Sequence, residues 1–591
     1  MGTETRNDSG TKLTPLGIIL SVGVIAALLA GGWYVLMAPR KTVTVPVAAV
    51  SVASVPAVAA AAVPAATAVD ANKTVEASDL STVTTVKEYK YVPAEKLPPV
   101  KGVSGYEWDP NEKILKFSYN VWIGWMPVIA ANHGTKPNTD SIFYKKYGFK
   151  VEMVLMDDPV SARDAYAAGK VHALWGTADM LAMFAPDLAK DSRTSPRIVQ
   201  QIDFSSGGDG IVVRSAIKSV KDLRGKTIVC AQNSPSEYFI TTLMISAGLR
   251  QSDVHMKYTS TAFEAAAAFV ADPTIDAVVS WSPDIYKISD RVAGTRILTT
   301  TSEANKLIAD VYAFRADFYR DHADVVKGFV KGVFEGMDYV KDNTEEVAQW
   351  MADAFGMKPE DIKGMMADAH STNFAENVQF FLNKSNPTNF ERTWKNASIV
   401  YRELGRIDAP VPFDSVMDFS IIKQLQDEGL FATQTDQSVA TFTPQDYRRI
   451  KAESPILTQT IRINFFPNSA DPYEPARDEL GNVIPGKLFD PSVAATLERV
   501  GNLAGQFGRC AIVISGHTDN SRKGDIPYAA VKQLSQDRAQ SVQNALTEKF
   551  KFDPNKFVVV GKAWDEPADP ADPSNQALNR RVEISVIPPE K

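Results

Sequence analysis

Three short stretches near the carboxyl end decide how this chain is interpreted: Gly516–Asp519 (GHTD), Leu534–Ala539 (LSQDRA) and Asn579–Glu583 (NRRVE). Each lies beside a run of residues with strand or helix character. They supply one acid, one arginine and an Asn-Arg-Arg cluster. A carboxylate accepts hydrogen bonds from an ammonium group, and a guanidinium pairs with a carboxylate. The set therefore suits a ligand that carries both an ammonium and a carboxylate.

The order of these motifs resembles the OmpA-like peptidoglycan-binding domain, which holds envelope proteins to the cell wall through diaminopimelate. The resemblance implies that Asp519 accepts the ammonium group and that Arg538 clamps a carboxylate bidentately. Thr518, Asn579 and Arg580 fall in the same motifs and would line the groove. The alternative is that Asp519 and Arg538 simply pair as a salt bridge. The segment 523–530 between them is longer than usual for the family.

The resemblance predicts a small α+β domain over 455–591 with the order β-α-β-α-β-β. We expect its first strand and turn at 462–470, its helices at 491–507 and 534–550, and its remaining strands at 511–515, 556–561 and 581–587.

Length and composition indicate several ordinary globular units. The chain has 591 residues, 45% of them hydrophobic and 23% charged, and a net charge of -7; the length favours about three to four folded units. So mild a charge gives no sign of nucleic-acid binding. Cys230 and Cys510 are predicted to be buried free thiols. The six histidines form no HExxH motif or close pair, so we expect no metal site and no cofactor.

Residues 13–38 carry no charged side chain. They exceed the roughly 20 apolar residues that a membrane-spanning helix needs, and Trp33 and Tyr34 suit the membrane interface. The competing interpretation is a secretory signal cut at Ala30–Gly32. Because the apolar run continues to Met37, we favour an uncleaved anchor, with residues 1–12 as a cytoplasmic tail. The absence of an ionisable group in the helix argues against an ion-driven motor subunit.

Residues 39–112 are assigned to a linker. From 42 to about 86 the sequence is almost entirely Ala, Val, Thr, Ser and Pro. It has little helical or alternating period and no aromatic residue to start a core. We expect a semi-extended tether that lifts the folded part away from the membrane.

From residue 113 to about 440, predicted strands alternate with helices, which indicates α/β architecture with parallel sheets covered on both faces. Helical spacing is clear at 323–340 and 344–355. The stretches 164–173 (DAYAAGKVHA), 219–228 (SVKDLRGKTI) and 374–381 (FAENVQFF) resemble the type II periplasmic solute-binding fold. The branch of that fold that these stretches resemble includes nitrate-, sulfonate- and thiamine-precursor-binding proteins. A two-lobed domain over 113–440 is the expectation.

Ligands in such sheets lie at the carboxyl ends of the strands. The residues that follow predicted strands there are Trp122, Trp125, Thr177, Asn233, Ser234, Ser236 and Trp281. Ser234 or Ser236 would cap a helix whose free N–H groups form an anion site, so the solute is expected to be anionic. The alternative is that the serines are ordinary caps and the tryptophans plain core.

Together these features predict an inner-membrane protein with one spanning helix, its amino terminus in the cytoplasm and its bulk in the periplasm. It would bind peptidoglycan and a small solute, as a sensor or as a tethered binding component of an ABC-type transporter with an inner-membrane partner. The alternative is a structural membrane-to-wall tether whose central domain is a ligand-free partner platform. Enzymes of thiamine-precursor type use a cysteine-rich iron-binding stretch, but Cys230 stands alone. We therefore expect no enzyme activity.

Overall fold

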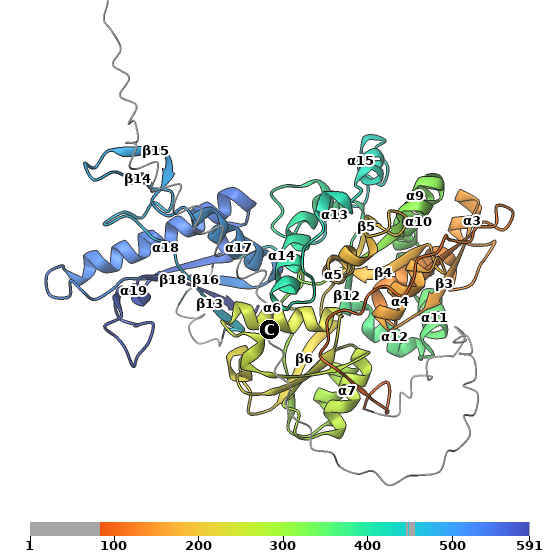
Figure 1. Cartoon of the computed structure of the whole chain (residues 1–591), viewed down its shortest axis with the longest axis horizontal. Coiled ribbons are helices and arrows are strands. Elements are labelled where there is room, and N and C mark those ends of the chain that lie inside the picture. The colour runs from red at the N-terminus through yellow and green to blue at the C-terminus, as the bar shows by residue number, and fades with distance from the viewer. Residues whose placement is uncertain (1–82, 445–446, 448–454, 590–591) are drawn as a thin grey trace, which may run out of the picture. The chain divides into compact units, whose positions relative to one another are not determined.

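The computed structural model describes residues 83–444, 447 and 455–589 (Figure 1). The predicted cytoplasmic tail, the anchor at 13–38 and the linker as far as residue 82 lie outside the described residues. Within the part that is described, no helix combines the length and the hydrophobicity needed to cross a bilayer.

The first lobe is built on a six-stranded sheet with the order β12-β5-β11-β4-β2-β3. Its strands are β2 (Ile114–Tyr119), β3 (Lys150–Leu155), β4 (Ala173–Thr177), β5 (Pro196–Ser205), β11 (Ala309–Arg315) and β12 (Ala369–Ser371). β2 runs parallel to β3 and β4, whereas β11 runs antiparallel to both β4 and β5. Figure 1 shows early (orange) and later (green) elements interleaved in this lobe.

Helices accompany this sheet in two groups. The earlier group is α2 (Met126–Asn132), α3 (Ile142–Tyr147), α4 (Pro159–Ala167) and α5 (Ala178–Leu188). The later group is α9 (Ala316–Asp321), α10 (Ala323–Asp342), α11 (Thr344–Phe355), α12 (Pro359–Met365), α13 (Phe374–Leu382), α14 (Phe390–Glu403) and α15 (Ser420–Asp427). The helical periods predicted at 323–340 and 344–355 correspond to α10 and α11.

The second lobe has its own six-stranded sheet, β1-β8-β7-β9-β6-β10. Its strands are β1 (Tyr91–Val92), β6 (Asp209–Arg214), β7 (Thr227–Ala231), β8 (His255–Thr259), β9 (Ala277–Trp281) and β10 (Thr295–Thr300). Its helices are α6 (Pro235–Ser246), α7 (Ala262–Ala271) and α8 (Asp284–Arg291). Both sheets are mixed rather than wholly parallel. The antiparallel strands include those that carry the chain from one lobe to the other, β5 to β6 and β10 to β11.

The two crossings between the lobes are hydrogen-bonded to each other. Thr301, just after β10, accepts hydrogen bonds from the backbone N–H groups of Gly207 at 2.9 Å and Asp209 at 3.2 Å. Its hydroxyl also lies 2.7 Å from the Ser205 hydroxyl at the end of β5. The lobes are therefore joined at this point by two adjacent crossings, the arrangement of a hinge.

Residues 83–112, which the sequence analysis assigned to the linker, are packed on both lobes; we call this segment the strap. The Thr85 backbone N–H and hydroxyl both donate to the buried Asp284 carboxylate, and Tyr91–Val92 pairs with the edge strand β8. Further along, Arg163 donates to the Pro98 carbonyl at 2.7 Å and Arg315 to the Ser104 carbonyl at 2.8 Å. Buried arginines need acceptors, and the strap backbone provides them.

The carboxyl-terminal domain has a four-stranded sheet, β13-β18-β16-β17. Its strands are β13 (Leu457–Ile461), β16 (Ala511–His517), β17 (Phe557–Gly561) and β18 (Arg581–Ile587). Its helices are α17 (Val493–Gln506), α18 (Tyr528–Phe550) and α19 (Gln576–Asn579). A separate hairpin is formed by β14 (Pro475–Arg477) and β15 (Val483–Leu488). The order β13-α17-β16-α18-β17-β18 agrees with the predicted β-α-β-α-β-β. The opening strand lies at 457–461, where Leu457 and Ile461 are buried, and not at 462–470.

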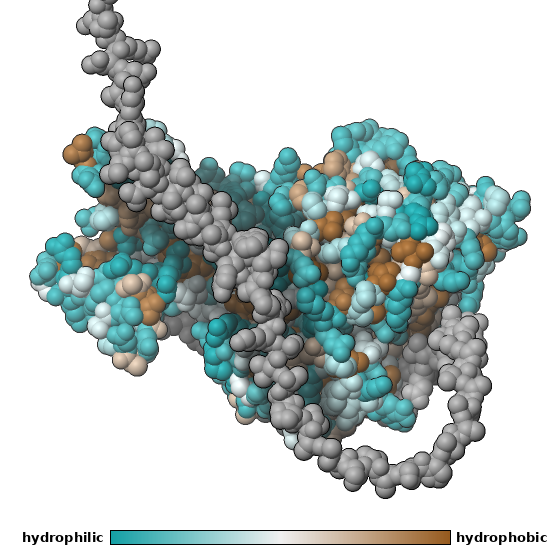
Figure 2. All heavy atoms as spheres, in the orientation of Figure 1, coloured by the Kyte–Doolittle hydropathy of each residue, from teal (hydrophilic) through white to brown (hydrophobic). Residues whose placement is uncertain are grey.

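Both cysteines are free and buried, as predicted. Burial raises the pKa of the Cys510 thiol to about 12, so the thiol is unreactive at neutral pH. On the molecular surface, the face shown in Figure 2 is mostly hydrophilic, with hydrophobic residues in small, scattered groups. This pattern is ordinary for a globular protein.

Candidate functional sites

The candidate wall-binding groove lies at the carboxyl end of β16, the strand between β18 and β17. Asp519 follows this strand, Arg538 is on α18, and Arg580 joins α19 to β18. Gly516 allows α18 to lie directly on the strand, because a Cβ there would be 2.1 Å from the Ser535 carbonyl oxygen. The glycine of the GHTD motif thus permits the close packing of the helix that carries Arg538.

Asp519 is held as a carboxylate by two neighbours. Its Oδ2 accepts a hydrogen bond from Arg580 Nη1 at 2.8 Å, and its Oδ1 accepts from the Ser521 backbone N–H at 3.0 Å and from the Ser521 hydroxyl. Burial by itself would raise the pKa of Asp519, but the bonds from Ser521 and Arg580 bring it below the usual value. The group is therefore ionised at neutral pH and offers an acceptor at the groove.

Arg538 has its guanidinium fixed at one edge only. Nε donates to the Ser469 carbonyl at 3.0 Å, and the guanidinium carbon lies 4.9 Å from the centre of the Phe465 ring. Among the described residues, neither Nη group has a hydrogen-bond or carboxylate partner. The simple Asp519–Arg538 salt bridge is not formed, since Asp519 pairs with Arg580 instead. The two Nη donors remain for a ligand.

The other two predicted groove residues contact the loop at 562–575, and the Thr518 hydroxyl is buried without a partner among the described residues. Asn579 accepts from the Ala568 backbone N–H at 2.9 Å and donates to the Pro573 carbonyl at 3.0 Å, so its amide shapes the loop at 562–575. The Thr518 backbone N–H donates to the Ala563 carbonyl at 2.8 Å. The sequence analysis missed Ser469, Ser521 and Phe465. Of these, only Ser521 could have been suspected from the sequence, because a residue two positions after an aspartate in a turn often donates to that carboxylate.

The seven predicted solute residues are all buried, none more than 5% exposed. Trp125 and Thr177 match the alternative in which these residues are ordinary core residues or helix caps. Trp125 donates to Asn120 Oδ1 at 2.8 Å and lies 5.2 Å from the Phe117 ring, within the core of the first lobe. The Thr177 hydroxyl accepts from the Met180 backbone N–H at 3.2 Å and caps α5.

A carboxylate of the protein lies beside the anion site expected at the start of α6. Glu237 accepts from the Asn233 backbone N–H at 2.9 Å and forms a buried ion pair with Arg406. The Ser234 hydroxyl donates to the Ala231 carbonyl and does not cap the helix. The Ser236 hydroxyl, in the first turn, is buried and has no partner within the described residues. The local charge does not favour an anionic ligand here.

Trp122 and Trp281 lie beside carboxyl groups at the hinge. The Trp122 indole N–H is 3.2 Å from Asp203 Oδ2, and its ring covers Gly208, where a Cβ would meet the ring at 2.3 Å. Trp281, at the end of β9, is the register partner of Asp209 in β6. Its indole N–H has no partner among the described residues. The sequence analysis found both tryptophans but missed the acids around them.

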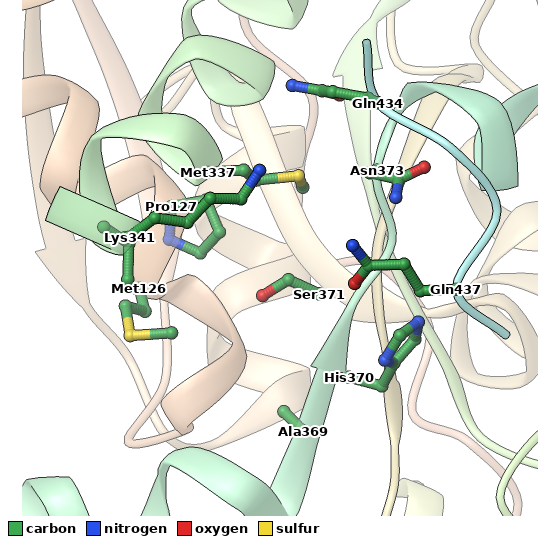
Figure 3. Close-up of a pocket in the computed structure, with 11 residues that line it drawn as sticks. Met126, Pro127, Met337, Lys341, Ala369, His370, Ser371, Asn373, Gln434 and Gln437 are labelled. Atoms are coloured by element: carbon green, nitrogen blue, oxygen red, sulfur yellow. The ribbon is translucent and has the colours of Figure 1, made fainter. Parts of the chain in front are cut away.

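A separate pocket of about 210 Å³ lies on the first lobe (Figure 3). It is lined by Met126, Pro127, Met337, Val340, Lys341, Ala369, His370, Ser371, Asn373, Gln434 and Gln437. None of the predicted solute residues is among them. Several of its polar groups are already engaged: His370 lies 2.6 Å from Glu376, and Gln434 donates to Asp338 at 2.9 Å. Within the described residues, no cluster of His, Cys, Asp or Glu could hold a metal ion.

Comparison with known families identifies two domains in this chain. Residues 139–347 match the family described as NMT1/THI5 like, and residues 487–581 match the OmpA family. Both matches fall in the regions that the sequence motifs indicated. The chain thus combines an NMT1/THI5-like domain with a carboxyl-terminal OmpA domain.

Among curated proteins, the chain is similar to the outer membrane protein Omp38 of two Acinetobacter baumannii strains. The identity is 34% over 95 residues, which is 16% of this chain and 24% of the relative. The match therefore spans about a quarter of the length of those relatives.

Several solved structures resemble part of the chain. The alkanesulfonate-binding protein SsuA from Xanthomonas axonopodis pv. citri, bound to MOPS, is 15% identical; the match covers 52% of this chain and 99% of that one, with a TM-score of 0.41. The periplasmic nitrate-binding protein NrtA from Synechocystis PCC 6803 is 14% identical, with coverages of 56% and 92% and a TM-score of 0.42. The desulfurization enzyme DSZB is 15% identical, with coverages of 54% and 99% and a TM-score of 0.39.

Proposed function

We propose that this is a cell-envelope protein that binds diaminopimelate-containing peptidoglycan through its OmpA domain and a small solute through its two-lobed domain. In this proposal the helix at 13–38 spans the inner membrane and the rest of the chain lies in the periplasm. The observation that carries the proposal is that an ionised Asp519 lies near Arg538, whose Nη groups have no partner within the described residues.

The groove has the chemistry that a zwitterionic stem peptide requires. An ammonium group of diaminopimelate would donate to Asp519, which retains acceptor capacity beyond its bonds to Ser521 and Arg580. A carboxylate of the same residue would accept two parallel hydrogen bonds from the Arg538 Nη groups. Arg580 balances the charge of Asp519 before the ligand arrives and can keep its hydrogen bond when the ammonium group binds the remaining lone pairs, so that no charge is left unpaired.

The two-lobed domain supports solute binding through its connectivity. Two adjacent crossings allow one lobe to rotate on the other, the motion by which hinged domains close on a ligand. A binding domain held between membrane and wall cannot diffuse, which favours local sensing or delivery to a fixed transporter. The absence of a catalytic motif in the sequence favours binding over catalysis.

A pull-down with purified peptidoglycan tests the wall-binding part of the proposal. Asp519→Ala and Arg538→Ala should each abolish co-sedimentation of the full chain, since each removes one half of the zwitterion clamp. Arg522→Ala is the matched control, because it removes an exposed arginine three residues from Asp519 and should retain binding. Retention by both groove variants would refute the assigned groove.

A further inference from the structure

Four aspartates gather where the hinge strands join the two lobes; we call them the hinge carboxyls. Asp179 is in the first turn of α5, directly after β4, Asp203 is in β5, Asp209 begins β6, and Asp310 is in β11. Asp310 is the register partner of Asp203 on one side and of Thr177 on the other. Directly opposed side chains share a face with their Cβ atoms about 5 Å apart. The four side chains are no more than 5% exposed.

Among residues 83–444, 447 and 455–589, no cation balances the hinge carboxyls. In the described part of the chain, none of them lies in an ion pair with Lys, Arg or His. The nearby arginines are used elsewhere: Arg315 is bound to Asp317, and Arg406 to Glu237. A buried carboxylate without a counter-charge is costly, and four together are far more so.

The ionisable groups around the hinge carboxyls are mostly acids as well. The charges that act on them are one another, Asp368, and His370, which is itself bound to Glu376. Burial raises the pKa of Asp179 to about 6, and burial together with Asp179 and Asp368 raises that of Asp209 to about 7. Burial and the adjacent Asp203 raise the pKa of Asp310 as well.

Several buried polar atoms at the hinge carboxyls have no partner within the described residues. They are Asp179 Oδ1, Asp209 Oδ1, the Trp281 indole N–H and the Tyr238 hydroxyl. Trp281 is directly opposite Asp209, so its side chain lies on the same face of the sheet. The Tyr238 ring stacks at 6.0 Å on Tyr401, whose hydroxyl donates to Asp179 Oδ2 at 3.2 Å. Buried polar groups are normally hydrogen-bonded, so these four point to a ligand.

We infer that the hinge carboxyls recognise an organic cation whose charged group is a protonated nitrogen with N–H donors, such as a primary ammonium or an amidinium. This inference rests on the proposed solute-binding function and names its ligand class. N–H donors match the free oxygens of Asp179 and Asp209. The indole rings of Trp122 and Trp281 supply apolar surface for the carbon part of the ligand and favour a cation.

A metal ion fits this site less well than an organic cation. The described residues contain no group of His, Cys, Asp or Glu arranged to hold a metal. The two tryptophans cannot act as metal ligands, whereas they can pack against carbon. The anionic solute expected from the sequence would bring a further negative charge to four uncompensated carboxyls.

Thermal unfolding of the full chain with three isosteric probes tests the charge preference. At about ten millimolar, benzamidinium should raise the melting temperature of the two-lobed domain by about 2–3 °C if its Kd is near 1 mM. Neutral benzamide and anionic benzoate should leave it unchanged. Butylammonium serves as a second, non-aromatic cation. Binding should weaken from pH 7.5 to pH 5, because the carboxyls then hold protons that the cation would have to displace.

The variant Asp179→Asn/Asp209→Asn should lose the shift while keeping its fold, since both amides preserve the size of the side chains. Asp284→Asn is the matched control, a buried carboxyl held by Thr85 in the second lobe, and it should keep the shift. A larger shift with benzoate would overturn the cation inference but leave solute binding intact. No shift with either cation, or an equal shift in the double variant, would also overturn it.

Discussion

At the scale of single residues, the guanidinium of Arg538 is the most specific part of the candidate wall-binding groove. Its Nε donates to the Ser469 carbonyl, which restrains the plane of the group, and neither Nη group has a partner among the described residues. A lysine at this position would keep the charge but lose the planar fork that matches a carboxylate.

Arg538→Lys is therefore expected to reduce peptidoglycan binding nearly as much as Arg538→Ala, by about tenfold or more, since a charge-assisted hydrogen bond contributes roughly 1.5–3 kcal/mol. Titration with a soluble diaminopimelate-containing stem peptide would measure this. Arg522→Lys controls for the loss of an arginine on the adjacent loop. Wild-type affinity in Arg538→Lys would show that charge alone suffices.

The hinge carboxyls make the stability of the two-lobed domain depend on pH. Unfolded aspartates lose their protons near pH 4, whereas the folded state holds those of Asp179 and Asp209 to about pH 6 and 7. Between these values the folded state binds more protons, so the free energy of unfolding falls as the pH rises from about 4 to about 7.

Calorimetry should therefore give a melting temperature for this domain that is lower at pH 7.5 than at pH 5, by on the order of 5 °C. In Asp179→Asn/Asp209→Asn the difference should shrink, because the amides do not titrate. An unchanged difference in that variant would assign the pH dependence to other groups.

At this scale the sequence predicted the candidate wall-binding groove but not the hinge carboxyls. Asp519 and Arg538 belong to motifs that can be recognised along the chain. Asp203 and Asp310 lie 107 positions apart and become neighbours only through the register of β5 and β11. An acid within an apolar run, as in IADVYAF at 308–314, was the one local signal that such a group would be buried.

At the scale of elements, α10 packs closely on its neighbours through a row of glycines, of which Gly336 faces α2 and the other two face Phe143, Tyr147 and Phe149 in and after α3. Gly328, Gly332 and Gly336 follow one another at four-residue steps along α10 and therefore share a face. A Cβ at Gly336 would lie 2.1 Å from the Pro127 carbonyl oxygen of α2. Because this neighbour is backbone, it cannot move aside without shifting the helix.

Gly336→Ala is expected to destabilise the two-lobed domain by about 1–3 kcal/mol, the usual cost of overpacking. Gly364→Ala, in α12, is the matched control, since a Cβ there meets no atom within 4 Å. The control should be neutral or stabilising by up to ~1 kcal/mol, because alanine favours helix. Denaturant unfolding of both variants measures the difference; equal stabilities would contradict the close approach of α10 and α2.

The helices themselves were predictable, because apolar residues at three- and four-residue steps mark α10 and α11 in the sequence. The mixture of parallel and antiparallel strands in the sheets was not predictable from the sequence. Strand–helix alternation predicts parallel pairing, and it does not record where the chain leaves one sheet and enters another. The strands that follow each crossing, β6 and β11, run opposite to their neighbours for that reason, and local sequence carries no signal of it.

At the scale of the whole molecule, the proposed compartment can be tested directly because both native cysteines are buried. An impermeant maleimide should leave the native chain unlabelled. Ala530→Cys introduces an exposed thiol on α18 and should be labelled in intact cells whose outer membrane has been permeabilised. Labelling only after lysis of the inner membrane would place the OmpA domain in the cytoplasm and would contradict the proposed function.

The strap is a third link between the two lobes, in addition to the two hinge crossings. Thr85 and β1 fasten its first part to the second lobe, and Pro98 and Ser104 fasten its later part to the first. Between these attachments the Glu95 carbonyl accepts hydrogen bonds from Gln232 of the second lobe and from Arg406, which follows α14. Rotation of one lobe on the other would have to exchange some of these hydrogen bonds, so the strap adds to the free energy that opening requires.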